Sequence, residues 1–474
     1  MRTLLWFRRN LRVHDQPLFR VDEAAVGVWI LDPREMLATD PAGFPRCGTH
    51  RLRFLLESVA DLRSQLRGLG SELIVRVGEP ESVLAELAQH LEVGTVRTIE
   101  EPGTEERTTE RAVAKSLPEH CVFDRMPPET LFEFDDPHEV SRELPEVFSK
   151  FRRTSEKREH IGVPLPTPTS LSAFPIDVPP GDIPTLHDLG REDQAPNPKG
   201  VMAFQGGESV GLARVEDWIF TGDHLQRYKE TRNGLVGADY SSKFSPWLAL
   251  GCVSSRHVAA ETLRYEAERV ANDSTYWLRF ELIWREYFRL YLLKHGPRLF
   301  RRGGPQDRDL GWANPAGHFE AWCAGETGEP FVDANMIELK ETGFMSNRGR
   351  QNVASFLTKN LDVDWRLGAR WFESHLMDYC PAANWGNWAY AAGVGADPRG
   401  FRGFDVQKQA RNYDPNREFV GRWYNRANQD QPLVDPRISL ANAEARWEAS
   451  SNQSKKAAII EQHTRNENKN AKIF

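Results

Sequence analysis

The chain has 474 residues, about three times the usual domain length, so two or three domains are expected. Hydrophobic residues make up 40% and charged residues 27%, an ordinary globular composition that excludes wholesale disorder. The sequence has no apolar run of about 18 residues and no signal peptide, so we predict a cytoplasmic protein without membrane contact. Five scattered cysteines without a C-x-x-C pair argue against a metal site or a disulfide framework.

The net charge of −7 and the tryptophans are unevenly distributed. Residues 1–150 carry 19 basic and 27 acidic side chains, whereas residues 151–474 are almost balanced. Twelve of the 14 tryptophans follow residue 200. Such a cluster indicates either a large aromatic core, which is the commoner case, or a surface that stacks on planar ligands.

The first 126 residues alternate between short apolar runs and amphipathic segments. We predict strands at 3–7, 26–31, 72–77, 96–100 and 121–126, and helices over 50–67, 80–91 and 104–117. This alternation predicts an α/β domain with a doubly wound parallel sheet. No G-x-G-x-x-G follows the first strand, so the sequence does not support a dinucleotide in the usual crevice. The topology still provides a ligand crevice at the strand ends.

Nine prolines between residues 164 and 198 predict a long loop, because proline at that density forbids helix. Helical periodicity follows near 208–220, 254–269, 274–295, 330–341, 346–361 and 365–377. We therefore predict an α/β domain (1–130), a linker (131–200), an all-α domain (201–425) and a polar C-terminal tail (426–474).

The segment 275–289 combines an apolar stripe with a carboxylate. Trp277, Glu281 and Trp284 share one helix face. Two interpretations are open. In the first, Glu281 pairs with Arg285 one turn along the helix, beside an apolar stripe that belongs to the core. In the second, Glu281 is a hydrogen-bonding group between two flat tryptophan rings, which suits a flipped base.

Two more regions are candidates for a ligand. The run S-S-K-F-S-P at 241–246, with Tyr228 upstream, places hydroxyls and a lysine at a helix start, as a phosphate site needs, although a plain N-cap has the same pattern. The charge-poor, aromatic stretch 377–395 contains a lone Asp378, for which Arg350 is a candidate partner. Such stretches more often form core, but this one also suits a flat, deep cofactor pocket.

With these segments in order, the sequence resembles the photolyase/cryptochrome family, and most of all its DASH cryptochrome branch. The similarity runs from W-F-R-R-N-L-R-V-H-D at 6–15 to about Trp423. Its most specific blocks are residues 237–254, 280–288, 335–359 and 384–399. The resemblance implies an α/β antenna domain and an all-α domain that binds FAD, joined by the proline-rich loop.

The resemblance also implies cofactor contacts. The FAD phosphate segment is matched by Tyr228, Ser241, Ser242, Lys243, Phe244, Ser245 and Arg285. Arg350 and Asp378 match an ion pair beside the flavin, and Asn384 matches the residue opposite flavin N5. Trp388, Trp365 and Trp312 match a row that carries electrons from the surface to the excited flavin, with core packing as the alternative for each.

The implied activity is light-driven repair of cyclobutane pyrimidine dimers by electron transfer from reduced FAD. Glu281 would hydrogen-bond a pyrimidine carbonyl, and Trp284 would stack on the flipped lesion. The catalytic and lesion-binding residues expected from the resemblance are Glu281, Trp284, Met345, Asn347, Asn384 and Tyr390. We expect a monomer that acts on single-stranded DNA.

Three departures from the family pattern stand out. Tyr390 replaces a second stacking tryptophan of ordinary photolyases, as in the DASH branch, which favours single-stranded DNA. Cys380 stands where the family usually has a carboxylate, in the motif D-Y-D, and the residues after Trp423 follow no family pattern.

An antenna and two other functions complete the expectations. Glu101 matches a contact to a folate such as 5,10-methenyltetrahydrofolate, with a solvated acidic loop as the alternative. The chain could instead be a blue-light photoreceptor or a DNA-binding module without repair. Glu281, Trp284 and Asn347 favour repair.

Overall fold

The structure is a computed structural model that describes all residues except 1, 22, 309, 398, 425–430 and 451–474. The chain forms two compact units, which are described separately below. The first contains residues 1–296, 338–348 and 370–386, and the second contains residues 297–337, 349–369 and 387–474. In the described ranges, no helix is both long enough and apolar enough to cross a membrane.

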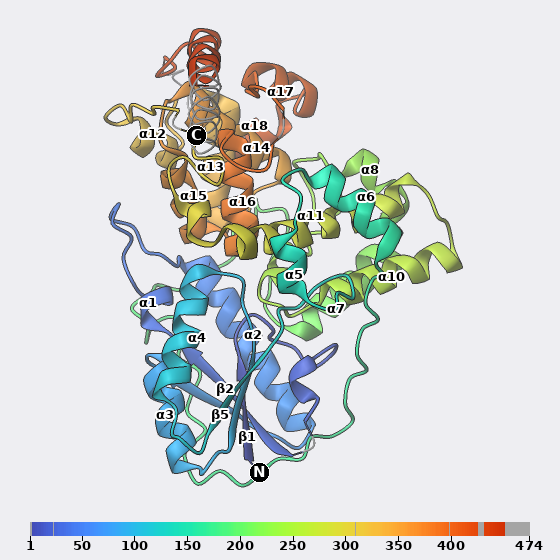
Figure 1. Cartoon of the computed structure of the whole chain (residues 1–474). Helices are drawn as coiled ribbons and strands as arrows, with labels where there is room; N and C mark the ends of the chain where they lie inside the picture. The colour runs from blue at the N-terminus through green and yellow to red at the C-terminus, as the bar shows by residue number, and fades with distance from the viewer. Residues whose placement is uncertain (1, 22, 309, 398, 425–430, 451–474) are drawn as a thin grey trace, which may run out of the picture. The chain divides into compact units, whose positions relative to one another are not determined.

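A five-stranded parallel sheet forms the N-terminal part of the first unit, as predicted (Figure 1). Its strands are β1 (Arg2–Phe7), β2 (Ala24–Leu31), β3 (Leu73–Val77), β4 (Thr95–Ile99) and β5 (Val122–Met126), in the order β3-β2-β1-β4-β5. The connecting helices are η1 (Pro17–Phe19), α1 (Pro33–Met36), α2 (Thr49–Gly68), α3 (Pro80–His90) and α4 (Thr104–Ser116). The chain passes from β1 through β2 to β3 in one direction along the sheet and then crosses back to β4 and β5 in the other. Because such crossovers are right-handed, α2 lies on one face of the sheet, and α3 and α4 lie on the other.

Side-chain alternation along β2 explains the two helical layers. Val26 and Val28 are buried in a core cluster that includes Leu84 of α3. Gly27 points the other way, and a Cβ there would lie 3.1 Å from Leu66 of α2. The strand is therefore buried on both faces, as expected for a parallel sheet between two helical layers.

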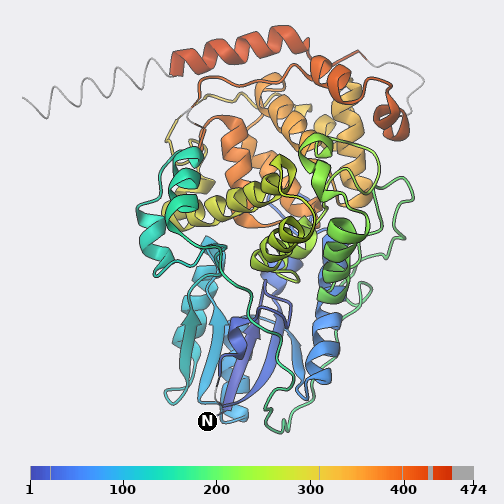
Figure 2. The same ribbon diagram turned by 90° about the vertical axis from the view of Figure 1, so that its right-hand side faces the viewer.

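The proline-rich segment runs along the outside of this sheet, so the predicted loop is present (Figure 2). The backbone N–H of Val75 in β3 donates to the carbonyl oxygen of Pro180 at 2.7 Å, and that of Ala25 donates to Ser172 at 2.8 Å. Phe174 is buried in the core cluster. Because β3 is an edge strand, these contacts cover backbone groups that could otherwise pair with another chain.

The segment 131–160 contains more helix than the predicted linker. It includes α5 (Pro137–Arg142) and α6 (Phe148–Arg158), which pack against α11 (Asp273–His295) of the same unit. The dense prolines that indicate a loop begin only at Pro164. The other helices of this unit are α7 (Glu208–Glu216), η2 (Asp217–Thr221), η3 (Leu225–Arg227), α8 (Tyr228–Thr231), α9 (Ser245–Ala249) and α10 (Ser255–Glu268).

The second unit is helical. The predicted all-α domain (201–425) does not coincide with it, because residues 201–296 belong to the first unit. The second unit contains α12 (His318–Ala324), η5 (Phe356–Asn360), α17 (Val406–Tyr413) and α18 (Glu418–Trp423), and it shares η4 (Gly296–Phe300), α13 (Pro330–Thr342), α14 (Asn347–Ser355), α15 (Trp365–His375) and α16 (Pro381–Ala392) with the first unit. Residues 436–450 of the predicted tail are helical. Asn360 donates to the carbonyl oxygen of Pro436 at 2.8 Å and to Ser439 Oγ at 2.9 Å, which holds this helix in place. Residues 425–430 and 451–474 of the tail lie outside the described residues.

Candidate functional site

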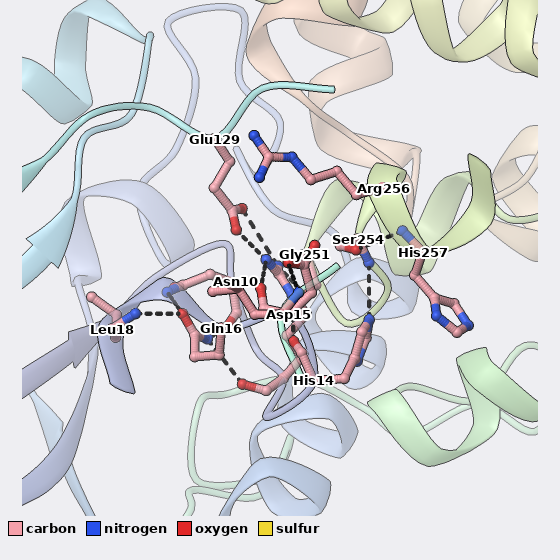
Figure 3. Close-up of polar contacts among 12 residues, drawn as sticks. Asn10, His14, Asp15, Gln16, Leu18, Glu129, Gly251, Ser254, Arg256 and His257 are labelled. Carbon is pink, nitrogen blue, oxygen red and sulfur yellow. Dashed lines mark hydrogen bonds and ion pairs between the residues drawn. The ribbon is translucent and has the colours of Figure 1, made fainter. Parts of the chain in front are cut away.

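The loop after β1 joins the sheet to the helices of the first unit (Figure 3). Arg12 is 1% exposed and forms an ion pair with Glu129. Its guanidinium also donates to the carbonyl oxygens of His14 (3.0 Å), Asp15 (2.8 Å) and Gly251 (2.9 Å). A buried charge is stable only when it is paired and hydrogen-bonded. The arginine therefore holds this loop against residue 251.

The carboxylate of Glu208, at the start of α7, is a second buried anchor. It accepts from the backbone N–H groups of Val13 (2.6 Å) and His14 (2.9 Å) and from the side chain of Gln65 (2.9 Å). His14 Nδ1 lies 2.5 Å from Glu208, and His14 Nε2 accepts the backbone N–H of Ser254 at 3.3 Å. Because Nε2 accepts, the imidazole proton is assigned to Nδ1, which donates to the carboxylate.

The backbone of Gly251 lies directly against the backbone of Arg9 in the β1 loop. Its φ is +67°, and a Cβ there would lie 2.0 Å from the carbonyl oxygen of Arg9, so only glycine fits. The adjacent Leu250 carbonyl accepts the N–H of Leu11 at 3.2 Å. Because α9 ends at Ala249, the β1 loop positions the C-terminal end of the helix that begins within the segment predicted to bind phosphates.

Lys243 occupies a strained position in that segment. Its φ is +61°, a left-handed conformation that costs energy for a residue with a side chain. The side chain is 3% exposed, and its Nζ donates to Ser241 Oγ at 3.0 Å. Burial, together with the nearby Arg214, holds the Lys243 pKa well below its usual value. No carboxylate in the described residues lies within ion-pair distance of this lysine, which is typical of a site that receives an anion.

Two arginines support the phosphate segment from neighbouring helices. Arg214 of α7 donates to the carbonyl oxygen of Ser242 at 3.3 Å. Arg285 of α11 donates to the carbonyl oxygen of Leu248 at 3.0 Å, and burial and repulsion by Arg289 lower its pKa. The sequence reasoning missed Arg214, because no local pattern connects it to a partner 28 residues away.

Glu281 pairs with a neighbouring segment and not along its own helix. Its Oε1 accepts from Arg232 Nη1 at 2.6 Å and from Trp277 Nε1 at 3.1 Å. The hypothesis of a Glu281–Arg285 pair is wrong, because Arg285 bonds to Leu248 of α9. Burial raises the pKa of Glu281, and the charge of Arg232 opposes this increase. The Glu281 side chain is 33% exposed, so it remains accessible to a ligand.

Trp284 lies among aromatic side chains. Phe148 of α6 stacks on it with ring centroids 3.5 Å apart and planes at 10°, and Phe288 lies 5.4 Å away at 27°. Trp284 is half-buried, so part of its ring remains accessible. Its stacking on a base stays a prediction, and it would use the ring area that Phe148 leaves open.

Helix α16 brings Asn384 alongside α11. A Cβ at Gly386 would lie 2.3 Å from the Phe288 ring, so glycine permits close packing of the two helices. Asn384 and Cys380 are both 8% exposed. Cys380, which replaces the family's usual carboxylate, lies within electrostatic range of Arg285.

The other predicted cofactor and lesion residues differ in exposure and in location. In the first unit, Tyr228, Phe244, Met345 and Asp378 are buried, Ser241 and Ser242 are half-buried, and Ser245 and Asn347 are exposed. Arg350 lies in the second unit, so its ion pair with Asp378 stays a prediction. Tyr390 also lies there, and its hydroxyl accepts hydrogen bonds from Arg399 and Arg402.

The three predicted electron-transfer tryptophans are buried in the second unit. Trp312, Trp365 and Trp388 are 4%, 0% and 2% exposed. The indole N–H groups of Trp365 and Trp312 donate to backbone carbonyl oxygens at 2.9 Å and 3.1 Å. A Cβ at Gly368 would lie 2.3 Å from the Trp388 ring, so Trp388 packs directly on the helix that carries Trp365. Trp312, expected at the surface end of the row, is almost completely covered.

Glu101 follows β4 at the carboxyl edge of the sheet. It is 7% exposed, and its N–H donates to Glu110 Oε1 at 3.1 Å. It lies within electrostatic range of Arg9 and Arg289. Glu101 is buried, so it is not the solvated side chain of the alternative interpretation. Its contact with a folate stays a prediction.

Comparison with known proteins accounts for this arrangement. Residues 3–169 match the family model for DNA photolyase, and residues 277–472 match the FAD binding domain of DNA photolyase. A cryptochrome DASH from Gloeobacter violaceus is 50% identical over 425 residues, which cover 89% of this chain and 85% of the relative. The chain belongs to the photolyase/cryptochrome family. Cryptochrome DASH, chloroplastic/mitochondrial, from Arabidopsis thaliana is 46% identical over 429 residues, with 89% and 75% coverage.

Solved structures of the family show the same fold. The Synechocystis cryptochrome superposes with a TM-score of 0.88 at 40% identity, covering 94% of this chain and 99% of that chain. A class III photolyase from Agrobacterium tumefaciens gives a TM-score of 0.80 at 26% identity, with 95% and 98% coverage. The predicted family and the predicted combination of an α/β domain with a helical FAD-binding domain are confirmed.

FAD, the cofactor of the matched domain, fits the residues found in the first unit. Its diphosphate is anionic, and the buried Lys243 and the half-buried Arg285 have no carboxylate within ion-pair distance in the part of the chain that the structure describes. A phosphate bound beside them would supply the charge that the protein leaves unmatched. Lys243 and Arg285 would thus hold the phosphates, and Asn384 would face the flavin.

Glu286, next to Arg285 on α11, is the most buried carboxyl group of this helix. It is 1% exposed, and its Oε1 has no hydrogen-bond partner among the described residues. Burial raises its pKa from 4.5 to about 7, against the opposing charges of Arg289 and Arg285. The folded protein therefore holds this proton more tightly than the unfolded chain does.

We predict that Glu286 makes the protein less stable as pH rises. The fold favours the protonated form of Glu286. The stability that this proton contributes is therefore fully present below pH 4.5 and is lost as pH rises towards about 7. Relative to Glu286→Gln, the wild-type free energy of unfolding should fall by up to ~3 kcal/mol across this window. Urea unfolding of both proteins at several pH values measures this difference. A difference that does not change with pH would contradict the prediction.

Proposed function

We propose that this protein repairs cyclobutane pyrimidine dimers, chiefly in single-stranded DNA, in a reaction driven by blue or near-UV light. The observation that carries this proposal is the Glu281 site, where an accessible carboxylate lies against Trp277 and pairs with Arg232. When bound, reduced FAD supplies the electron that splits the dimer. The dimer must leave the base stack to reach the site, and this costs least in a single strand.

Glu281 would hold the dimer by donating a hydrogen bond. A carboxyl group donates to a pyrimidine carbonyl only when it carries a proton, and burial favours that form by raising the Glu281 pKa. Arg232 favours the ionised form while it is paired with Glu281. A DNA phosphate is an alternative partner for its guanidinium. Transfer of Arg232 to the phosphate would remove the charge that opposes the raised pKa of Glu281 and would so favour its protonated form beside the lesion.

Aromatic side chains would hold the planar rings of the lesion. Trp277 and Trp284 flank Glu281 on α11, with Phe148 behind part of Trp284. Tyr390 offers a smaller stacking surface than a tryptophan would. Weaker stacking lowers the free energy available to extract a base from duplex, so we propose a preference for single strands.

The buried tryptophans of the second unit would return the flavin to its reduced state. Indoles are readily oxidised, and the approach of Trp388 to Gly368 places its ring against the helix of Trp365. We propose that electrons pass from Trp312 through Trp365 to Trp388 and then to the flavin. This path serves photoreduction only, and repair by an already reduced protein does not need it.

A folate antenna is a further element of the proposal. Glu101 lies at the carboxyl edge of the parallel sheet, where ligands of such folds usually bind. Its burial beside Arg9 and Arg289 supports a polar site there. We propose 5,10-methenyltetrahydrofolate as the ligand, with Glu101 as one of its contacts.

The direct test is repair of a thymine dimer in a single-stranded oligonucleotide by FAD-loaded, chemically reduced protein. We expect thymines to be restored in light and not in darkness. Glu281→Gln should lower the yield per absorbed photon about tenfold, because the neutral amide that replaces the carboxyl group donates a weaker hydrogen bond, while flavin absorbance stays unchanged.

Glu266→Gln is a matched control for this assay. Glu266 pairs with Arg279 of α11 at 2.7 Å, much as Glu281 pairs with Arg232, although its side chain is 15% exposed against 33% for Glu281. The control should keep the wild-type yield. Absence of repair despite bound reduced flavin would contradict the proposed function, and an unchanged yield in Glu281→Gln would make that carboxylate structural.

We predict a separate effect for Trp388→Phe. Phenylalanine keeps the packing against Gly368 but is much harder to oxidise, so photoreduction of the oxidised flavin should fall at least tenfold (order of magnitude). Chemically reduced protein should keep its repair yield. Flavin absorbance during illumination measures the first effect, and unchanged photoreduction would remove Trp388 from the electron path.

A further inference from the structure

Helix α6 carries a basic face that the repair site, as described so far, does not use. Lys150, Arg153 and Lys157 follow the spacing i, i+3 and i+7, which places them on one side of the helix, and all three are exposed. In the described ranges, none of them forms an ion pair with an acidic side chain. Exposed charges are often only solvated, so the position of this face decides what it can do.

Contacts to α11 fix the orientation of α6. Phe148 stacks on Trp284 with ring centroids 3.5 Å apart. Further along the helix, the hydroxyl of Tyr276 donates to Glu156 at 2.7 Å and accepts from Arg152. The aromatic residues and the polar pair of α6 are therefore turned towards α11. The basic face is left to solvent.

A second cationic segment approaches α11 on the other side of Glu281. Lys229 of α8 and the guanidinium of Arg232 lie 5.1 Å and 4.9 Å from the centre of the Trp277 ring. Arg232 also pairs with Glu281 at 2.6 Å. Trp284 and Tyr276 contact α6, whereas Trp277 contacts Lys229 and Arg232. Helix α6 and this second segment therefore both pack on the part of α11 that carries Glu281.

We infer that the exposed face of α6, formed by Lys150, Arg153 and Lys157, binds phosphates of the DNA strand that flanks the lesion. This inference rests on the proposed function and adds the path of the strand to it. Phosphate contacts position a strand without reading its sequence, as a site for dimers in any context requires. Upstream of α6, Glu139 and Glu143 are exposed together with Arg142, so the surface there is of mixed charge and attracts a phosphate less than the basic face of α6 does.

The test is the salt dependence of binding to a fluorescein-labelled oligothymidylate. Anisotropy is measured in darkness with FAD-loaded protein over a series of KCl concentrations. The test variant is Arg153→Ala/Lys157→Ala, and the matched control is Arg111→Ala/Lys115→Ala on α4. Both pairs are exposed, one turn apart and without ion pairs among the described residues, and in both the arginine donates one hydrogen bond within its own helix, at 3.1 Å and 3.0 Å.

The α6 variant should show a shallower slope of log K against log [KCl], by about 1.4, because each phosphate contact on a single strand contributes about 0.7. Its affinity should fall about tenfold near physiological salt. The α4 control should keep the wild-type slope and affinity. Equal slopes for the α6 variant and the wild type would overturn the inference, provided that flavin absorbance and far-UV circular dichroism show an intact fold.

This result is separable from that of the repair assay, since binding to undamaged DNA needs neither light nor a lesion. A shallower slope in the α6 variant without repair by the wild type would refute the proposed function and support the strand path. Repair by the wild type with equal slopes would refute the strand path and support the function.

Discussion

Removing a charge from water costs several kcal/mol unless the protein or a ligand supplies a partner, and this constraint shapes the first unit. Where the protein supplies the partner, the charge stabilises the fold. Arg12 pairs with Glu129 and three carbonyl oxygens, and Glu208 accepts the backbone N–H groups of Val13 and His14. These contacts fix the β1 loop against residues 250–254. The α/β sheet thereby supports the segment that precedes them.

Where the protein supplies no acidic partner, the charge indicates a ligand. Lys243 is buried and Arg285 is half-buried close to α9, and loss of hydration lowers the pKa of both. The strained φ of Lys243 and the glycine-only contact at Gly251 show that the chain accepts a cost to keep this segment in place. Glu281 differs, since its partner Arg232 can exchange it for a phosphate. The β1 loop contacts, the proposed cofactor site and the proposed strand-binding site thus differ in the group that neutralises each charge.

Local patterns predicted most of the fold. The strands and helices were predictable because alternation and amphipathicity are readable within one segment, whereas the phosphate-binding role of the 241–245 segment stays a prediction. Arg214 and Arg232 were not predictable, because their partners lie 28 and 49 residues away and follow no spacing rule. The same limit explains the wrong Glu281–Arg285 pair, since proximity along a helix does not exclude a stronger partner outside it. Residues 137–158 were assigned to a linker because the proline signal downstream obscured two short helices.

The central claim is that Lys243 is held without an acidic partner in order to bind the FAD phosphates. Lys243→Met tests it most directly, because methionine has a similar shape and no charge. Two quantities are needed, the FAD dissociation constant and the thermal stability of the cofactor-free protein. The account predicts FAD binding at least tenfold weaker (order of magnitude), since a charge-assisted hydrogen bond is lost, together with a more stable cofactor-free protein, since a buried charge is removed. Unchanged FAD affinity with a less stable cofactor-free protein would contradict the account and make Lys243 a structural residue.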